Sequence, residues 1–251
     1  MTIKNRDEIA VMRMGGKILS AALSMVAARL AVGVSLKELD EIAERAIRAA
    51  GGEPAFLHYR PDGASSPYPA SICASVNEYV VHGLPGDYCL KDGDLISIDL
   101  GVRFKGLCTD GARTFIVGNG SPAARRLLEI TEAALYLGIK EARAGHTLGD
   151  IGHIISSYAR KNKISVIKGL TGHGIGRELH EEPVVWNVGR PGEGIELVPG
   201  MTIAIEPMFS LGGGDIVRED DDSYRTRDHS LSAHFEHTVA ITAGPPLILT
   251  K

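Results

Sequence analysis

The sequence predicts an α+β fold in which two helices followed by short strands occur twice along the chain. Two pairs of segments show the apolar periodicity of helices, short β-branched runs follow each pair, and two short motifs recur at matching places in the two halves. The alternative is that such short patterns recur by chance. We expect an internal duplication whose halves each bring acidic residues to a shared centre.

The first half opens with two predicted helices. Apolar residues from Ile9 to Leu30 recur every three or four positions, which lays one stripe along a helix that Gly33 ends. Ser35 to Glu38 predict a capping box for a second helix, which carries apolar residues from Leu36 to Ile47 and ends at Gly51-Gly52. After a loop rich in proline and glycine, we expect strands at Ile72 to Val76, Tyr79 to Val81, Leu95 to Leu100 and Thr114 to Val117.

The second half repeats this order. Ser121-Pro122 predicts the start of a third helix that ends at Gly145, and Thr147 predicts the cap of a fourth. The strand motif that leads to Asp99 recurs in the run that leads to Glu206, so each copy ends on a carboxylate. We therefore expect one domain over residues 1–251, with halves of roughly 1–118 and 119–251.

Composition excludes several classes of protein. A hydrophobic fraction of 44%, a charged fraction of 23% and a net charge of -4 are those of an ordinary globular protein and disfavour a nucleic-acid surface. Cys73, Cys89 and Cys108 leave an odd cysteine and no C-x-x-C spacing, which favours a reducing compartment. Charges near the N-terminus disfavour a signal peptide, and no run of eighteen apolar residues indicates a membrane span. We expect a cytoplasmic protein.

Four carboxylates end or interrupt apolar strands, where a charge is costly. If residues 103–106 form a hairpin turn, Asp99 and Asp110 lie directly opposite each other, with Cβ atoms about 5 Å apart. Either a raised pKa or a cation must then relieve their repulsion. Glu206 and Glu236 repeat the anomaly in the second half. One such glutamate is commonly a solvated edge residue, but four carboxylates together favour a shared cation site.

Histidine adds a further ligand type. His173 lies between glycines that let the backbone approach a crowded centre, and His180 follows seven residues later. A single buried histidine is commonly a hydrogen-bonded core residue. One imidazole with four carboxylates nevertheless suits two adjacent divalent ions, with Co, Mn, Fe and Zn as candidates.

Sequence motifs of other enzyme classes are incomplete or absent. The run from His180 to Val184 lacks the second histidine of H-E-x-x-H, and Arg177 replaces the final glycine of G-x-G-x-x-G after Gly172 and Gly174. The sequence contains no G-x-x-x-x-G-K-[ST] loop and no G-x-S-x-G elbow. The metal interpretation remains.

With these residues, the sequence resembles the type I methionine aminopeptidases, which are pita-bread metallopeptidases. The matching stretches follow the order of that family: Cys73 to Glu78 leading to His82-Gly83, Ile98-Asp99, Thr109 to Gly111, Thr171 to Gly176, Leu179 to Pro183, Ile205 to Met208, and Glu236 to Thr238. The resemblance implies a pita-bread fold with two halves related by pseudo-twofold symmetry, each with helices packed on antiparallel strands.

The resemblance also implies a role for each matching residue. The metal ligands would be Asp99, Asp110, His173, Glu206 and Glu236, with Asp110 and Glu236 bridging both ions. Glu206 would also take a proton from the attacking water. His82 and His180 would be catalytic and would contact substrate without binding metal. Tyr68 and Cys73 would form walls of the pocket for the methionine side chain.

The implied activity is a dinuclear-metal aminopeptidase that removes methionine from the N-terminus of nascent polypeptides with a small second residue. The resemblance suggests a monomer without membrane or specific nucleic-acid partners, and a transient association with ribosomes is compatible with such a substrate. One alternative is an X-Pro peptidase like prolidase or aminopeptidase P, whose usual extra N-terminal domain has no room before a first helix that begins near Asp7. The other is a non-catalytic pita-bread protein that binds peptides.

Two segments depart from the family pattern. The stretch from Leu57 to Pro67 is longer than usual before the Tyr-Pro pair. In the segment from Gly212 to Asp228, this chain has Asp221-Asp222-Ser223-Tyr224 where many relatives place a tryptophan. These departures put the pocket walls in question and leave the ligand set intact.

Overall fold

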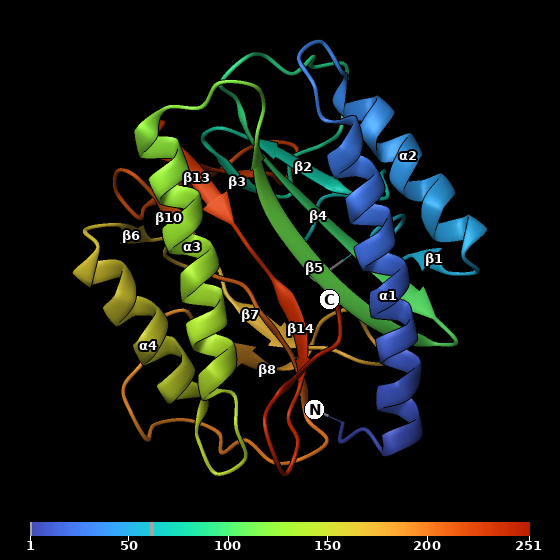
Figure 1. The fold of residues 1–251 in the computed structure, drawn as a ribbon, viewed down its shortest axis with the longest axis vertical. Coiled ribbons are helices and arrows are strands. Elements are labelled where there is room, and N and C mark those ends of the chain that lie inside the picture. Colours follow the sequence, from blue (N-terminus) through green and yellow to red (C-terminus); the bar gives the residue numbers. More distant parts are fainter. Residues whose placement is uncertain (1, 61–62) are drawn as a thin grey trace.

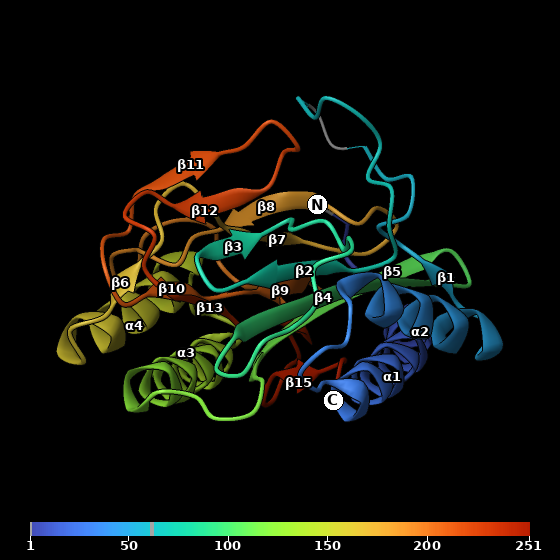
Figure 2. The same cartoon turned by 90° about the horizontal axis from the view of Figure 1, so that it is seen from above.

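Four helices cover one side of the strands (Figure 1, Figure 2). The structure, a computed structural model, describes residues 2–60 and 63–251, and these residues include the helices α1 (Arg6–Arg29), α2 (Leu36–Ala49), α3 (Pro122–Glu141) and α4 (Leu148–Lys161). Figure 2 shows α1 and α2 as one pair beneath the strands and α3 and α4 as the other. The two pairs of helices predicted from the apolar periodicity are therefore confirmed.

Polar residues begin the helices as the sequence indicates. The side chains of Ser121 and Thr147 accept hydrogen bonds from the backbone N–H groups that open α3 and α4. Ser35 caps α2 in the same way, but the predicted capping box is not closed. The carboxylate of Glu38 instead pairs with Arg29 at 2.7 Å. Helix α3 ends at Glu141, before the predicted Gly145.

The first half of the chain builds a sheet with the order β1-β4-β2, in which β5 also pairs with β4. Strands β4 and β5 are longer than predicted, because most of their residues are buried whichever way the side chains point, and alternation does not mark their ends. The strands of this half are β1 (Glu53–Pro54), β2 (Cys73–Val76), β3 (Tyr79–Val81), β4 (Leu95–Phe104) and β5 (Leu107–Ile116).

The register of the β4–β5 hairpin corrects one prediction. Asp99 pairs with Ala112, and Asp110 pairs with Gly101, so the two aspartates are not directly opposite each other. Lys105 and Gly106, both with positive φ, form the turn. A direct pairing of Asp99 with Asp110 would need a turn centred one residue earlier, between Phe104 and Lys105. Because the offset is two residues, both side chains still lie on the same face of the sheet.

The second half contributes a five-stranded sheet with the order β15-β14-β9-β7-β8 and a smaller one with the order β13-β10-β6. A third sheet, β11-β12-β3, joins strands from both halves. All the described pairings between strands are antiparallel, so the predicted α+β class is confirmed. These strands are β6 (Ser165–Val166), β7 (Gly172–Gly174), β8 (Glu181–Val185), β9 (Thr202–Ile205), β10 (Met208–Ser210), β11 (Ile216–Arg218), β12 (Tyr224–Thr226), β13 (Ser232–His234), β14 (His237–Ala240) and β15 (Leu247–Ile248).

Each pair of helices packs on its own hydrophobic cluster. Leu19, Leu39 and Ile98 lie in the cluster under α1 and α2, whereas Ile155 and Phe209 lie in the one associated with α3 and α4. Among the described residues, α1 is the one helix that is long and apolar enough to cross a membrane, judged by length and composition alone. The core helix of a globular protein passes the same test, and the buried stripe of α1 packs against β4 and β5.

Candidate metal centre and its pocket

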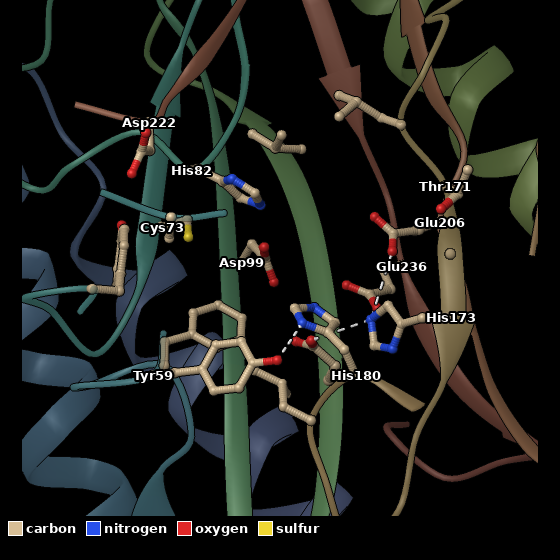
Figure 3. A pocket seen from close by; sticks show the side chains of 18 of the residues that line it. Tyr59, Cys73, His82, Asp99, Thr171, His173, His180, Glu206, Asp222 and Glu236 are labelled. Carbon is tan, nitrogen blue, oxygen red and sulfur yellow. Dashed lines mark hydrogen bonds and ion pairs between the residues drawn. The ribbon is translucent and has the colours of Figure 1, made fainter. Parts of the chain in front are cut away.

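The five candidate ligands come together where strands from both halves meet (Figure 3). Asp99 and Asp110 lie on the β4–β5 hairpin, His173 lies on β7, Glu206 directly follows β9, and Glu236 directly precedes β14. All four carboxylates are buried, and His173 is half-buried. Figure 3 shows Asp99, His173, Glu206 and Glu236 facing one another from different strands.

Backbone hydrogen bonds hold the acidic residues of the two halves together. The N–H of Glu236 donates to the carbonyl of Ala112 at 2.9 Å, which joins the start of β14 to β5. The N–H of Gly111 donates to the Oδ1 atom of Asp110, also at 2.9 Å. The carboxylates are thus positioned by rigid strands rather than by loops.

His173 presents one ring nitrogen to the carboxylates. Its Nδ1 lies 2.9 Å from the carbonyl oxygen of Gly174, which can only accept a hydrogen bond, so Nδ1 carries the proton. The Nε2 lone pair then faces Asp110 Oδ2 at 3.9 Å and Glu206 Oε1 at 3.7 Å. A Cβ atom at Gly172 or at Gly174 would overlap a backbone carbonyl of a neighbouring strand, as expected for glycines that allow close approach.

The carboxylates are electrostatically unfavourable as a group without a cation. Burial raises the pKa of Asp110 and of Glu206 to about 7. Loss of hydration, followed by the charges of neighbouring carboxylates, raises the pKa of Asp99 and Glu236 well above the ordinary range. Asp99 Oδ1 and Glu236 Oε1 are buried and lack a hydrogen-bond partner among the described residues.

These observations fit divalent cations. Unpartnered buried acceptor atoms and mutually repelling carboxylates are each stabilised by a bound positive charge. Ligand atoms of Asp110, His173 and Glu236 lie within 4.8 Å of one another, a spacing that one ion can span. Oxygen ligands with an imidazole are those that first-row divalent metals accept.

Two further histidines line the space in front of the carboxylates. The hydroxyl of Tyr59 lies 2.8 Å from Nδ1 of His180, whose ring is 4.4 Å from that of His173. Loss of hydration and the charges of His173 and His82 lower the pKa of His180 to about 3. His82 adopts a left-handed backbone conformation, with φ of 60°, and its ring contacts Tyr224 edge-on. Although its ring is accessible to solvent through the pocket, loss of hydration lowers its pKa.

A pocket of about 730 Å³ opens onto this centre. The two predicted wall residues both line it, with Cys73 buried and Tyr68 half-buried. The Tyr68 hydroxyl lies 3.0 Å from the backbone carbonyls of Ile72 and Gly83, to which it can donate, so its ring is held in place. Phe56 and Met208 add apolar surface. The inner part of the pocket is therefore mainly apolar and ends on carboxylates.

The two departures from the family pattern meet at the mouth of the pocket. Asp222 Oδ2 accepts hydrogen bonds from the N–H and the hydroxyl of Ser65, at 2.8 and 2.6 Å. Arg218 contacts Asp222 Oδ1 at 2.6 Å and donates to the carbonyl of Gly63 at 2.9 Å. Residues 63–65 and the β11–β12 hairpin therefore form one latch, hereafter the Ser65–Asp222 latch. Pro61 and Asp62, within the long segment, lie outside the described residues.

The structure adds three residues that the sequence analysis did not select. Tyr59 and Asp222 belong to segments that the sequence indicated only as uncertain walls. His234 is buried, its Nε2 lies 3.2 Å from Glu206 Oε2, and burial lowers its pKa to about 4. A signal existed for His234, because a residue two positions before Glu236 on an extended chain points to the same side.

Comparisons with known proteins agree with this geometry. A model of the metallopeptidase family M24 matches residues 10–243. A methionine aminopeptidase of Clostridium perfringens is 45% identical over 249 residues, which cover 99% of this chain and 98% of that protein. The crystal structure of the methionine aminopeptidase of Thermotoga maritima has a TM-score of 0.96 and 38% identity, and covers 100% of this chain and 99% of that one.

A more distant structure shares the fold alone. The prolidase of Pyrococcus furiosus has a TM-score of 0.77 at 23% identity, and the match covers 99% of this chain but 65% of the prolidase. The identity is higher for the two methionine aminopeptidases, and so is the share of the relative's own length that the match covers. The chain therefore belongs to the metallopeptidase family M24 and, within it, to the methionine aminopeptidases.

Proposed function

We propose that this protein uses two divalent metal ions to remove the N-terminal methionine from polypeptides with a small second residue. The observation that carries the proposal is a buried group of four carboxylates and an imidazole at the end of an apolar pocket. Nascent polypeptides present such N-termini, and two relatives that match this chain over nearly the whole length of both proteins are methionine aminopeptidases.

The donor set would hold the two ions between the halves of the fold. Asp99, Asp110, His173, Glu206 and Glu236 would hold these ions. Bound there, a pair of Co, Mn, Fe or Zn ions would supply an activated water and would polarise the scissile carbonyl. The protein then needs no nucleophile of its own.

Three side chains would move or hold protons during hydrolysis. Glu206, a buried carboxylate of the centre, could accept the proton of the attacking water. His180 stays neutral because its pKa is lowered. We propose that the hydroxyl of Tyr59, 2.8 Å from Nδ1, donates to that nitrogen, so that the ring proton lies on Nε2. That N–H can stabilise the developing oxyanion, while His82 can contact the leaving amide nitrogen.

The pocket supports methionine as the first residue. Its walls include Tyr68, Cys73 and Phe56, and we propose that they bound a narrow apolar subsite for an unbranched side chain. A flexible thioether fills such a space, whereas a β-branched side chain is too wide close to the backbone. The free α-amine of the substrate would lie beside the carboxylates, which explains an exopeptidase rather than an endopeptidase.

The rival activities differ in substrate, so one experiment separates them. The purified protein is assayed for bound metal and then for hydrolysis of Met-Ala-Ser, Ala-Ala-Ser and Ala-Pro peptides. We expect about two metal ions per chain and rapid cleavage of Met-Ala-Ser alone. A preference for the Ala-Pro peptides would overturn the proposal in favour of an X-Pro peptidase, and metal binding without any hydrolysis would favour a peptide-binding protein.

The proposal extends to organisation and location. One catalytic domain over residues 1–251, with halves of roughly 1–118 and 119–251, is consistent with ligands drawn from both halves. A cytoplasmic location is supported by three free cysteines, all among the described residues. We propose that the protein acts as a monomer and meets its substrates as nascent chains, with a transient association with the ribosome.

A further inference from the structure

His234 is a buried imidazole beside the candidate ligands, with no role in the ligand set assigned above. It ends strand β13, opposite Met208 of β10, and only 1% of its surface is exposed. Ligand atoms of His234, Glu206 and Glu236 all lie within 4.8 Å of one another. The ring of His234 therefore reaches the carboxylates from β13, whereas that of His173 reaches them from β7.

The backbone of His234 is held firmly. Its N–H donates to the hydroxyl of Thr114 at 2.9 Å, and that hydroxyl donates to the carbonyl of His234 at 2.8 Å. The hydroxyl of Ser97 lies 2.8 Å from the same Thr114 oxygen and supplies a further hydrogen bond. Because Thr114 and Ser97 are buried on β5 and β4, the imidazole is positioned by the strands that carry Asp110 and Asp99.

Both ring nitrogens of His234 lack a hydrogen-bond partner among the described residues. Leaving a buried polar atom without a partner is unfavourable, so such atoms call for an explanation. Nε2 lies 3.2 Å from Glu206 Oε2, but the two atoms do not form a hydrogen bond.

A shared cation explains this arrangement. Nitrogen and oxygen ligands lie about 2.1 Å from a first-row divalent ion, so two of them at an angle of 90 to 110° are about 3.0 to 3.4 Å apart. The separation of 3.2 Å between Nε2 and Oε2 falls in that range. A ligand atom of Glu236 completes a buried group whose members all lie within 4.8 Å of one another.

We propose that Nε2 of His234 is a sixth ligand of the metal centre, bound to the ion that Glu206 holds. This inference rests on the two-metal centre of the proposed function and adds a second imidazole to it. A second nitrogen ligand shifts the preference of the site away from Mn and Mg and toward Co, Zn and Fe, because imidazole suits the latter ions better.

X-ray absorption of the zinc-loaded protein tests the proposal without a variant. The scattering of imidazole rings counts the histidine ligands, and we expect two per pair of ions, from His173 and His234. A single imidazole per pair would overturn the assignment of His234. Failure of the wild-type protein to bind two ions would instead contradict the proposed function, so the two failures are distinguishable.

Substitution gives a second test. His234→Gln keeps a polar side chain of similar reach, and His153→Gln on α4 provides a control outside the pocket. We expect His234→Gln to weaken binding of one of the two Zn ions at least about tenfold and to change the visible spectrum of the Co-loaded protein. The control should change neither. An unchanged affinity and Co spectrum in His234→Gln would show that His234 does not bind metal. Circular dichroism of the metal-free variants checks folding.

Discussion

The hydroxyl of Thr238 makes two hydrogen bonds to the backbone of Asp110, each 2.8 Å long. It accepts one from the N–H of Asp110 and donates the other to the carbonyl of the same residue. Both residues are buried, Thr238 completely. Thr238 lies on β14 and Asp110 on β5, so this one side chain connects a candidate bridging ligand to the opposite half of the chain.

Replacing Thr238 with valine should therefore weaken both the fold and the metal centre. The change keeps the shape of the side chain but leaves the N–H and the carbonyl of Asp110 without partners, which costs about 1 to 3 kcal/mol for each group. We expect the free energy of unfolding in urea to fall by about 2 kcal/mol or more, with weaker metal binding. Thr238→Ser, which keeps the hydroxyl, is the control and should stay close to wild type. Equal stability of the valine and serine variants would contradict this account.

His82→Ala and His180→Ala should keep their metal and lose most of their activity. Neither residue is in the assigned ligand set, and each faces the space where the substrate reacts. We expect kcat/KM for Met-Ala-Ser to fall by about 10² or more, as when one stabilising group is removed from a transition state. Metal content is measured in parallel. Loss of metal in proportion to activity would show that these histidines are ligands.

Tyr59 acts through His180, and a smaller effect is expected from its removal. Tyr59→Phe deletes the hydroxyl that lies 2.8 Å from His180 Nδ1 and keeps the aromatic ring. The neutral imidazole can then carry its proton on either nitrogen. We expect kcat to fall by about tenfold while KM changes little. We also expect a change in the pKa that limits kcat on the acidic side of its pH profile. A rise in KM alone would indicate that Tyr59 only contacts substrate.

The metal-free protein should lose stability as the pH rises from about 6.5 through about 7 and should level off above that. Burial raises the pKa of Asp110 and Glu206 to about 7 in the folded state, whereas unfolded carboxyl groups titrate at about pH 4, so these two residues lower stability between the two values. The lowered pKa values of His180 and His234 act in the opposite sense, but their contribution is complete once the pH exceeds the unfolded value of about 6.5.

Thermal unfolding in the presence of a chelator, from pH 6.5 to 8, measures this effect. Asp110→Asn should show a shallower decline, because one of the repelling carboxylates is gone, and it should also have lost metal binding and turnover. In the metal-loaded wild type the decline should disappear, since the ions bind the deprotonated carboxylates. A flat profile for the metal-free wild type would contradict the mutual repulsion described above.

The Ser65–Asp222 latch should influence which second residues the enzyme accepts. Asp222→Asn weakens the contacts with Ser65 and Arg218, whereas Ser66→Ala, at a neighbouring position of the same rim, leaves them intact. With Met-X-Ser peptides in which X is Gly, Ala, Thr, Val or Leu, wild type should cleave Met-Ala-Ser rapidly and Met-Leu-Ser poorly. We expect Asp222→Asn to raise KM for Met-Ala-Ser and to leave its kcat little changed. The difference in cleavage rate between Met-Ala-Ser and Met-Leu-Ser should become smaller. An unaltered panel would exclude the latch as a determinant of specificity.

Much of the fold could be predicted from local patterns. The start of α3 depended on Ser121-Pro122 and that of α4 on Thr147, signals that operate within a few residues and that the structure confirms. The offset between Asp99 and Asp110 could not be predicted in the same way. It depends on whether the turn comprises Lys105-Gly106 or is centred one residue earlier, a small difference that shifts the whole register by two.

In the candidate site, too, some residues could be predicted from local sequence patterns and others could not. Carboxylates in apolar strands are conspicuous in a sequence, so Asp99, Asp110, Glu206 and Glu236 could be selected without a structure. The latch could not, because Ser65 and Asp222 are 157 residues apart and each is an ordinary loop residue by itself. His234 had one weak signal, its position two residues before Glu236, but its distance from Glu206 became known only from the structure.

The hydrogen bonds between Thr238 and Asp110 span 128 positions of the chain. A ribosome that has reached residue 118 has already added Asp99 and Asp110, but none of His173, Glu206 and Glu236 yet exists. The two aspartates are therefore made before any residue of the second half that could share a cation with them. Assembly of the centre must therefore wait for the second half, which makes peptidase activity a reporter that both halves of the chain have folded and docked.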